Sequence, residues 1–223
     1  MPNELRPELE PLPARMRDLP VDDRGYVVPW FVDWIDGKPE FRAMDRIKWI
    51  RAIREHLCWV CGGRLGVWQV FVLGPMCGIN RTTSEPPCHL ECAQWSARNC
   101  PFLARPHAVR RVAGMEETAC PAGIMIKRNP GVTLLWKTKT FEIFDDGQGA
   151  PLIRIGPQEG IEWYAEGRPA TREEVAYSVD TGLPYLEELA QAECPKAVAE
   201  LRQMAELYTA LYPATPAAVQ TGA

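Results

Sequence analysis

The spacing of cysteine and histidine between residues 58 and 100 constrains this chain more than any other feature of its sequence. Six of the eight cysteines fall in this stretch. Cys58 and Cys61 are separated by two residues and are followed by Gly62 and Gly63, whose conformational freedom lets backbone amides approach the sulfurs. Zinc takes four ligands in a tetrahedron, commonly as two such pairs a dozen or more residues apart. The sequence therefore predicts a zinc site whose first pair is Cys58 and Cys61.

The second pair of ligands lies about thirty residues further along the chain, where three candidates crowd one turn. His89 and Cys92 have the same two-residue separation as the first pair, and we predict that they complete the site. Cys88 is four residues from Cys92, which also places it on the same helix face, and it is the reserve ligand. Four protein ligands leave no open position for substrate or water, so the predicted Zn²⁺ is structural.

The residues around the second pair predict the start of a helix. Ser84 is the expected cap, Pro86 and Pro87 suit the first helical positions, and good helix formers continue to Asn99, just before Pro101. A cysteine knuckle, then extended chain, then a helix that supplies the last two ligands resembles the treble-clef zinc finger. The resemblance covers about residues 55–100 and implies a zinc-stapled, treble-clef-like module.

Other interpretations of the same residues stay open. Free cysteine is among the most buried residue types, so the thiols can belong to a core without metal. His89-Leu90-Glu91 matches the His-x-Glu core of zinc-dependent deaminases, but the Pro-Cys-x-x-Cys that should follow is missing, because Cys100-Pro101 and Cys120-Pro121 have the reverse order. An HNH-type nuclease needs further histidines, and only His56 and His107 remain once His89 is a ligand. Disulfides are less favoured, because no export signal begins the chain.

A basic segment precedes and overlaps the first cysteine pair. Residues 41–57 predict a helix with an apolar stripe at three- and four-residue spacing: Met44, Ile47, Ile50, Ile53 and Leu57. Residues 42–64 contain six basic and two acidic side chains. The candidate residues for binding nucleic acid or another partner are Arg42, Arg46, Lys48, Arg51, Arg54 and Arg64. A solvated helix face is the alternative interpretation of such a run.

Composition and charge limit the possible organisation. The 223 residues and 46% apolar content suit a globular chain with a substantial core. Residues 1–130 carry 18 basic and 15 acidic side chains, whereas residues 131–223 carry 7 and 14, so the C-terminal part is a poor surface for nucleic acid. The longest apolar stretch is too short to cross a bilayer. We expect a cytoplasmic protein with no membrane association.

The order of predicted elements gives an α+β class. Residues 1–22, with many prolines, are expected to be an extended or disordered arm, 23–112 a zinc-binding module, 113–212 a small antiparallel sheet with C-terminal helices, and 213–223 a disordered tail. Residues 25–32 predict a strand, followed by a turn at Asp36-Gly37. Further strands are predicted at 67–73, 122–127, 132–144, 152–155 and 161–164.

Three helices are predicted near the C-terminus. Thr171 and Glu174 form a capping box for the first, which Gly182 is expected to end. Pro184 is expected to begin a short helix and Pro195 a longer one. The apolar stripe of the last helix comprises Val198, Leu201, Met204, Leu207, Tyr208 and Leu211.

Several segments resemble a group of phage and prophage proteins. They are Arg24-Gly25-Tyr26, Pro29-Trp30-Phe31, residues 36–42, Cys58-Trp59-Val60-Cys61-Gly62, residues 71–77, Glu85-Pro86-Pro87-Cys88-His89 and Cys100-Pro101-Phe102-Leu103. The resemblance spans roughly residues 17–105. It implies a viral origin and action inside a bacterial host cell, and it transfers no catalytic residue.

These observations give three functional hypotheses. The first is a non-enzymatic, zinc-stabilised phage accessory protein that binds a bacterial host protein or nucleic acid in host takeover or anti-defence. The second is nucleic-acid binding through the basic segment. The third is a nucleotide- or nucleic-acid-modifying metalloenzyme centred on Cys77, His89 or Glu91, although no set of catalytic residues is recognisable.

Overall fold

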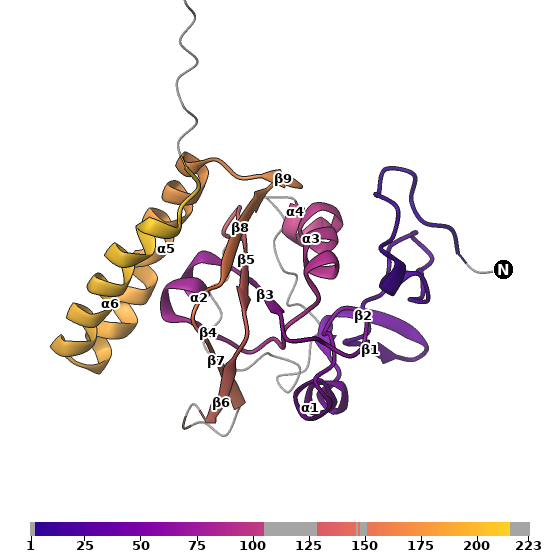
Figure 1. The fold of residues 1–223 in the computed structure, drawn as a ribbon, viewed down its shortest axis with the longest axis horizontal. Coiled ribbons are helices and arrows are strands. Elements are labelled where there is room, and N and C mark those ends of the chain that lie inside the picture. Colours follow the sequence, from indigo (N-terminus) through magenta and orange to yellow (C-terminus); the bar gives the residue numbers. More distant parts are fainter. Residues whose placement is uncertain (1–2, 105–128, 146, 148–150, 215–223) are drawn as a thin grey trace, which may run out of the picture.

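The computed structural model of the chain describes residues 3–104, 129–145, 147 and 151–214 (Figure 1). The helical elements are η1 (Ala14–Met16), α1 (Arg46–Glu55), α2 (Pro75–Asn80), α3 (Leu90–Asn99), α4 (Pro101–Ala104), α5 (Arg172–Glu193), α6 (Pro195–Tyr208) and η3 (Thr209–Leu211). The strands are β1 (Val32–Ile35), β2 (Lys38–Met44), β3 (Gln69–Leu73), β4 (Thr82–Thr83), β5 (Thr133–Thr138), β6 (Phe141–Asp145), β7 (Pro151–Ile155), β8 (Gly160–Ala165) and β9 (Arg168–Pro169). This mixture of helices and small antiparallel sheets confirms the α+β class.

The central sheet has the strand order β3-β5-β8-β9. Phe71 of β3 lies opposite Trp136 of β5, which in turn lies opposite Ile161 of β8. One sheet therefore joins the segment that carries the cysteine pairs to the segment that follows residue 129. The predicted boundary between residues 112 and 113 lies outside the described residues.

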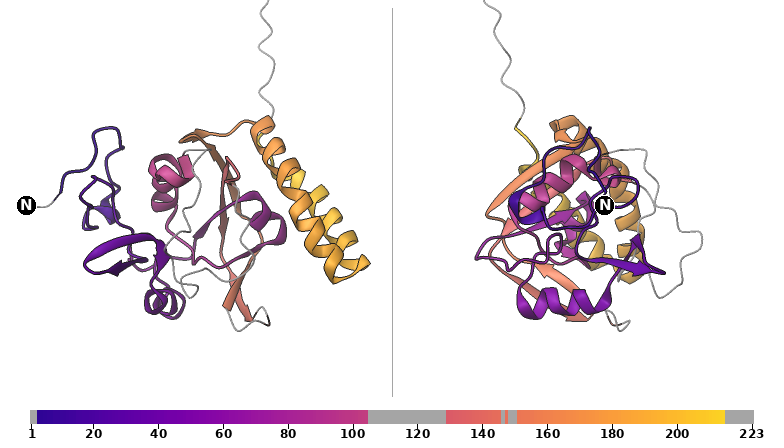
Figure 2. Two further views of the ribbon diagram at one scale, coloured as in Figure 1. Left: turned by 180° about the vertical axis from the view of Figure 1, so that it is seen from behind. Right: turned by 90° about the vertical axis from the view of Figure 1, so that its right-hand side faces the viewer.

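Each face of this sheet covers a separate hydrophobic core, because successive strand residues point to opposite faces. Phe71, Leu134 and Trp136 pack with residues of α2, α5 and α6 on one face. Val70 and Leu135 pack with α3 and the first cysteine pair on the other. Figures 1 and 2 show the same layering, with α5 and α6 on one side of the sheet and α3 and the N-terminal segment on the opposite side.

The N-terminal segment, where an extended or disordered arm is expected, is largely without regular structure and packs against the second core. Met16 is fully buried, and several leucines of this segment are partly buried against the same cluster. Asn99 at the end of α3 accepts a hydrogen bond from the backbone of Glu10, and Arg98 forms an ion pair with the Glu10 side chain. These contacts hold the segment beside α3.

The predicted strand at 25–32 is wrong in its position. The strand β1 begins only at Val32, and the preceding residues make a single β-bridge between Val21 and Val27. The predicted turn is confirmed, because Asp36 and Gly37 both have positive φ and close a two-residue connection between β1 and β2.

The helix predicted over 41–57 is shorter, and the predicted apolar stripe is confirmed in part. Met44 and Ile53 pack against the cores and Leu57 is buried, whereas Ile47 and Ile50 are exposed. Strand β2 occupies residues up to Met44, and Asp45 caps α1 by accepting hydrogen bonds from two backbone amides of its first turn. Ile47 is 72% exposed, whereas Ala52 is buried and Trp49 packs against the core. The indole of Trp49 donates a hydrogen bond to the Ser84 carbonyl, so this large ring fixes the rotation of the helix together with Ile53.

The C-terminal helices differ from the prediction in one respect. The capping box of Thr171 and Glu174 is confirmed. However, α5 continues unbroken through Gly182 and Pro184, where a stop and a new start were predicted. A Cβ at position 182 would come within 3.0 Å of the Met76 sulfur, so the glycine serves a close approach to α2 rather than a helix end. Proline cannot donate the helical hydrogen bond at position 184, which costs stability. The core packing of Leu183 and Leu186 on either side compensates for this loss.

The run predicted as one strand over 132–144 forms two strands in different sheets. Strand β5 belongs to the central sheet, while β6 pairs with β7 in a second sheet of order β4-β7-β6. The chain bends between them, where the amide of Gly156 donates to the Thr140 carbonyl. The predicted strand at 122–127 lies outside the described residues, as does most of the predicted tail. No helix within the described ranges has the length and apolar character that a membrane crossing requires.

Candidate metal centre

The first cysteine pair is held by a tight backbone turn directly after α1. The helix ends at His56, which has a left-handed conformation, and Leu57 then forms a bridge with Arg64. Inside that bridge the amide of Cys58 donates to the Gly63 carbonyl at 2.7 Å, and the amide of Gly62 donates to the Cys58 carbonyl. The turn brings the two cysteine side chains to the same side of the chain.

The second pair lies at the N-terminus of α3. His89 is the residue that caps this helix, and Cys92 is in its first turn. The predicted cap Ser84 is wrong, and Pro86 and Pro87 precede the helix instead of starting it. The carbonyl of Pro87 accepts a hydrogen bond from the Trp59 amide, which ties the approach to α3 directly to the turn that carries the first pair.

The structure brings together Cys58, Cys61, His89 and Cys92, which are the four residues predicted as ligands. Their candidate ligand atoms all lie within 4.8 Å of one another. Nδ1 of His89 is 3.4 Å from Sγ of Cys61 and 3.9 Å from Sγ of Cys92. Ligands at ordinary zinc bond lengths in a tetrahedron are separated by roughly 3.5–3.8 Å. The cluster is therefore a Cys3His set that can hold a metal ion.

A hydrogen bond from outside the cluster fixes the orientation of the histidine. Nε2 of His89 lies 3.0 Å from the carbonyl oxygen of Arg64. A carbonyl accepts only, so Nε2 carries a proton, and Nδ1 is the ring nitrogen that faces the sulfurs of the cluster. The amide of His89 also donates to Sγ of Cys58 at 3.3 Å, which favours a thiolate at that position.

The electrostatics of the cluster favour a bound cation. Cys58 and Cys92 are fully buried. Burial raises the pKa of Cys58, but hydrogen bonds from the neighbouring thiols and from His89 outweigh it and hold that pKa below its usual range. The hydrogen bonds with Cys58 and Cys61 raise the pKa of His89 to about 10. Negative charge thus concentrates on buried sulfur, where a metal ion can neutralise it.

Cys88, the reserve ligand, is next to the cluster but outside the four-residue group. Its backbone pairs with Val70 of β3 through two hydrogen bonds, and its side chain is buried. The hydrogen bond with Cys58, together with burial, raises the pKa of the Cys88 thiol well above its usual value. In this position Cys88 is a protonated donor to a ligand sulfur.

Cys77 and Glu91, two of the residues proposed for catalysis, do not have the environments that catalysis would need. Burial raises the pKa of Cys77 to about 11, so this thiol is protonated at neutral pH. Glu91 is exposed and forms an ion pair with Arg15 at 2.7 Å. Within the described chain, all the cysteines are free thiols, and Cys194 is exposed.

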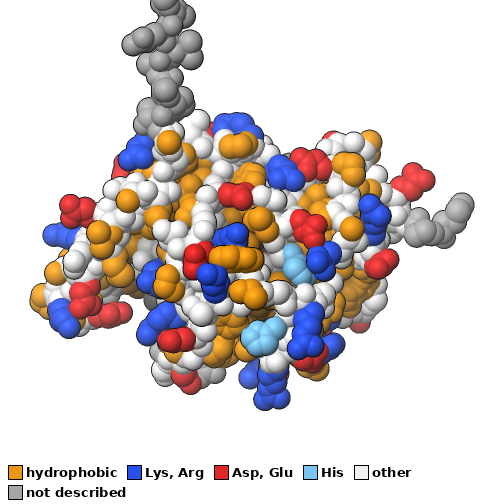
Figure 3. All heavy atoms as spheres, in the orientation of Figure 1, with side chains coloured by type: hydrophobic (Ala, Val, Ile, Leu, Met, Phe, Trp, Pro, Cys, Tyr) orange, Lys and Arg blue, Asp and Glu red, His pale blue; other side chains and the backbone are white. Residues whose placement is uncertain are grey.

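The six basic candidates fall into two groups, according to whether an acidic side chain pairs with them. Arg42, Lys48 and Arg51 form ion pairs with Glu40, Asp45 and Glu55 respectively. In the described part of the chain, Arg46, Arg54 and Arg64 have no acidic partner. Figure 3 shows histidine side chains on one face of the molecule with lysine and arginine side chains around them.

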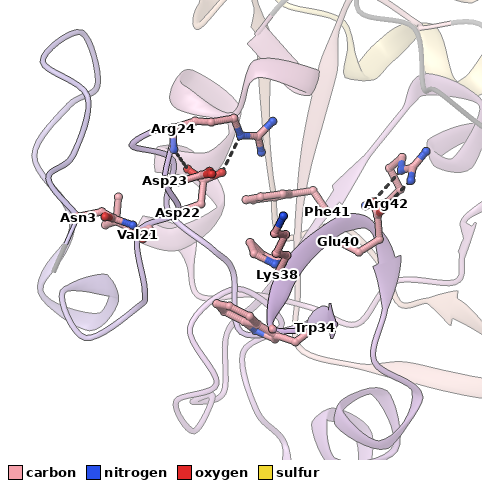
Figure 4. Close-up of a pocket in the computed structure, with 12 residues that line it drawn as sticks. Asn3, Val21, Asp22, Asp23, Arg24, Trp34, Lys38, Glu40, Phe41 and Arg42 are labelled. Carbon is pink, nitrogen blue, oxygen red and sulfur yellow. Dashed lines mark hydrogen bonds and ion pairs between the residues drawn. The ribbon is translucent and has the colours of Figure 1, made fainter. Parts of the chain in front are cut away.

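Arg42 lines an open pocket of about 510 Å³ between residues 21–24 and the β1–β2 hairpin (Figure 4). Its walls include the rings of Trp34 and Phe41, and the Arg24 guanidinium lies 5.3 Å from the Phe41 ring centroid. Because Glu40 neutralises Arg42 inside this pocket, the surface is mixed in charge. It lies on the hairpin, away from the ligand set.

We expect Gly62→Ala to destabilise the metal centre. Gly62 has φ +70°, and a Cβ there would come within 2.8 Å of the Trp30 ring. The left-handed conformation and the collision together should cost about 2–3 kcal/mol of unfolding free energy. Urea denaturation measures the loss. Gly66→Ala is the matched control, because a Cβ there meets nothing within 4 Å, and equal stability of the two variants would contradict the prediction.

Comparisons with protein-family models, curated proteins and solved structures find no match to this chain.

Proposed function

We propose that the cluster holds one structural Zn²⁺ and that the turn, β3 and α3 together form a treble-clef-like module. Three thiolates and one imidazole are a ligand set typical of structural zinc. The separations between His89 and the sulfurs fit a tetrahedron, and two of the sulfurs are buried. A knuckle followed by a helix that supplies the last pair is the arrangement that the treble clef uses.

The function that these features support best is that of a non-enzymatic binding protein. The observation that carries this proposal is the closed ligand set, since four protein ligands leave no position for a substrate. The resemblance to phage proteins supports the further proposal that it acts in a bacterial cell, on a host protein or nucleic acid. Host takeover or anti-defence is the role that such a viral accessory protein would have.

A metalloenzyme is the less favoured alternative. A catalytic zinc site keeps one position open for water, and a nearby carboxylate moves protons. Glu91, the carboxylate in the His-x-Glu segment, points to Arg15 and is exposed instead of facing the cluster. Cys77 would need a lowered pKa to act as a nucleophile, and its pKa is raised.

Nucleic-acid binding is the second candidate function. Among the residues that the structure describes, only three of the six basic candidates have a charge that no acidic neighbour neutralises. Arg46, Arg54 and Arg64 are exposed, while the other three cations are neutralised by acidic neighbours. Exposed cations without partners attract phosphate, and that attraction falls with salt. Charge alone does not distinguish a nucleic acid from an acidic protein.

The test is affinity capture from bacterial lysate with the zinc-loaded full chain as bait. One sample of the lysate is treated with nucleases and one is not. The proposal predicts a specific partner that a metal-depleted bait does not capture, because the binding surface depends on the module. Capture that nucleases abolish identifies nucleic acid, and capture that survives identifies a protein. Recovery of no partner by the zinc-loaded bait contradicts the proposal.

A further inference from the structure

Trp68 is an exposed indole with two lysine side chains over its ring. The ring is 44% exposed, in the loop between the first cysteine pair and β3. Nζ of Lys137 lies 4.2 Å from the ring centroid and Nζ of Lys139 lies 4.5 Å from it. Val67, beside the tryptophan, is 69% exposed. An apolar ring and two cations therefore share one solvent-facing surface, which we call the Trp68 surface.

The sheet register explains why these three side chains meet. Gln69 of β3 lies opposite Thr138 of β5, so Trp68 arrives next to the strand end that carries the lysines. Lys137 and Lys139 are two residues apart and therefore point to the same face. The stem of Lys137 also lies beside Gly160 of β8, the residue opposite it in the sheet. The arrangement is built on a central sheet, so its geometry is well defined.

The charge on this surface is incompletely neutralised. Lys139 forms an ion pair with Glu159 at 3.3 Å. Lys137 has no acidic partner within the described parts of the chain, and neither has Arg64, which is in the same loop as Trp68. Both ammonium groups lie over the ring, and among the described residues only that of Lys139 also pairs with a carboxylate. An incoming anion can therefore bind here without breaking a buried ion pair.

We propose that the Trp68 surface binds single-stranded nucleic acid, an inference that rests on the proposed binding function and names its ligand. An exposed aromatic ring provides a platform on which a base can stack once the ammonium groups that lie over it move from the ring to the phosphates on either side. A single strand fits better than a duplex, because a paired base has no free face to offer. The surface is small, so one or two nucleotides contact it directly.

The metal centre positions this surface. The carbonyl of Arg64 accepts the hydrogen bond from Nε2 of His89, which fixes the start of the loop that ends at Trp68. The loop is also held by the amide of Leu65, which donates to the His56 carbonyl. Loss of the metal would free His89 and weaken one of the contacts that hold the loop, so nucleic-acid affinity should decrease when zinc is removed even though no zinc ligand touches the strand.

The test measures binding of a fluorescent thymidine oligonucleotide of about a dozen nucleotides to the zinc-loaded full chain by anisotropy, across a salt series. We expect Trp68→Ala to weaken binding roughly 5- to 100-fold, the range for losing one stacked base. Lys137→Gln should lower the slope of log affinity against log salt by about 0.7, as expected for one phosphate contact on a single strand.

Matched controls separate this surface from general effects. Trp34 is 45% exposed on a different element, so Trp34→Ala should leave affinity within about twofold of the unchanged chain, since it removes a similar ring elsewhere. Lys196→Gln removes an exposed lysine of α6 and should leave the salt slope unchanged. Circular dichroism checks that each variant is folded. We expect all four variants to fold, because the side chains of Trp68, Lys137, Trp34 and Lys196 are at least partly exposed.

Each outcome decides the inference. No saturable binding of the single strand, or equal loss in Trp68→Ala and Trp34→Ala, overturns it. If affinity depends on Arg46 and Arg54 but not on Trp68, the protein binds nucleic acid elsewhere, and only this inference fails. If a lysate protein is captured through Trp68 while the oligonucleotide does not bind, the surface serves an acidic protein partner, and the nucleic-acid inference fails while the proposed function stands.

Discussion

A chain in which Cys58→Ser and Cys61→Ser are combined is expected to lose its metal and to lose cooperative folding. The two substitutions remove half of the ligand set. Apparent binding free energies of structural zinc reach about 10–16 kcal/mol, whereas a whole domain is stable by only about 5–15 kcal/mol. The two remaining members of the set, His89 and Cys92, cannot complete a tetrahedral site by themselves. Thermal unfolding followed by circular dichroism would show a broad or absent transition.

The control for this variant is Cys194→Ser. Cys194 is exposed at the junction of α5 and α6 and is far from the ligand set in sequence. Its substitution should change stability by less than about 0.5 kcal/mol, as is usual for surface positions. If the double variant melts as cooperatively as this control, the cluster does not stabilise the fold.

Replacement of Trp59 by alanine should have the second largest effect. Trp59 lies between the first two ligands in sequence, is 2% exposed, and stacks on Phe31 with ring centroids 4.9 Å apart. Emptying such a site costs about 3–5 kcal/mol, from lost burial and from the cavity that remains. The loss should also weaken metal retention, because the Trp59 side chain packs in the same core cluster as Cys58 and Cys92.

The variant Trp59→Phe distinguishes the contribution of the aromatic ring from that of the indole N–H. Within the described structure, Nε1 of Trp59 is buried and has no hydrogen-bond partner. Phenylalanine keeps an aromatic ring against Phe31 and removes that unsatisfied N–H, so its cost should be well below that of alanine. Urea denaturation of both variants provides the comparison. A phenylalanine variant as unstable as the alanine variant would contradict this account of the site.

The cluster of Cys58, Cys61, His89 and Cys92 could be predicted because it depends on local spacing. Two residues between cysteines, glycines behind them and a helix start at the second pair are all visible in the sequence. The α+β class and the capping box at Thr171 followed from similarly local signals. The choice between His89 and Cys88 needed the fold, since the pairing of Cys88 with Val70 directs that residue into the core.

The features that escaped prediction depend on contacts between distant parts of the chain. The rotation of α1 is set by Trp49 reaching Ser84, 35 residues away. The continuity of α5 depends on Gly182 meeting Met76 of α2. The Trp68 surface arises only because β3 pairs with β5, whose lysines are about 70 residues further along. The sequence shows that Lys137 and Lys139 would point to the same face of a strand. It does not show that this face lies beside Trp68.

The central claim is that the four ligands hold a structural zinc ion, and metal content tests it most directly. Elemental mass spectrometry of the untagged chain, purified without added metal, should give one zinc per chain, and chelation should unfold the protein as zinc is lost. The double variant at Cys58 and Cys61 should contain none. A folded, cooperative chain without zinc, or a chain that keeps its fold when zinc is removed, would contradict the account.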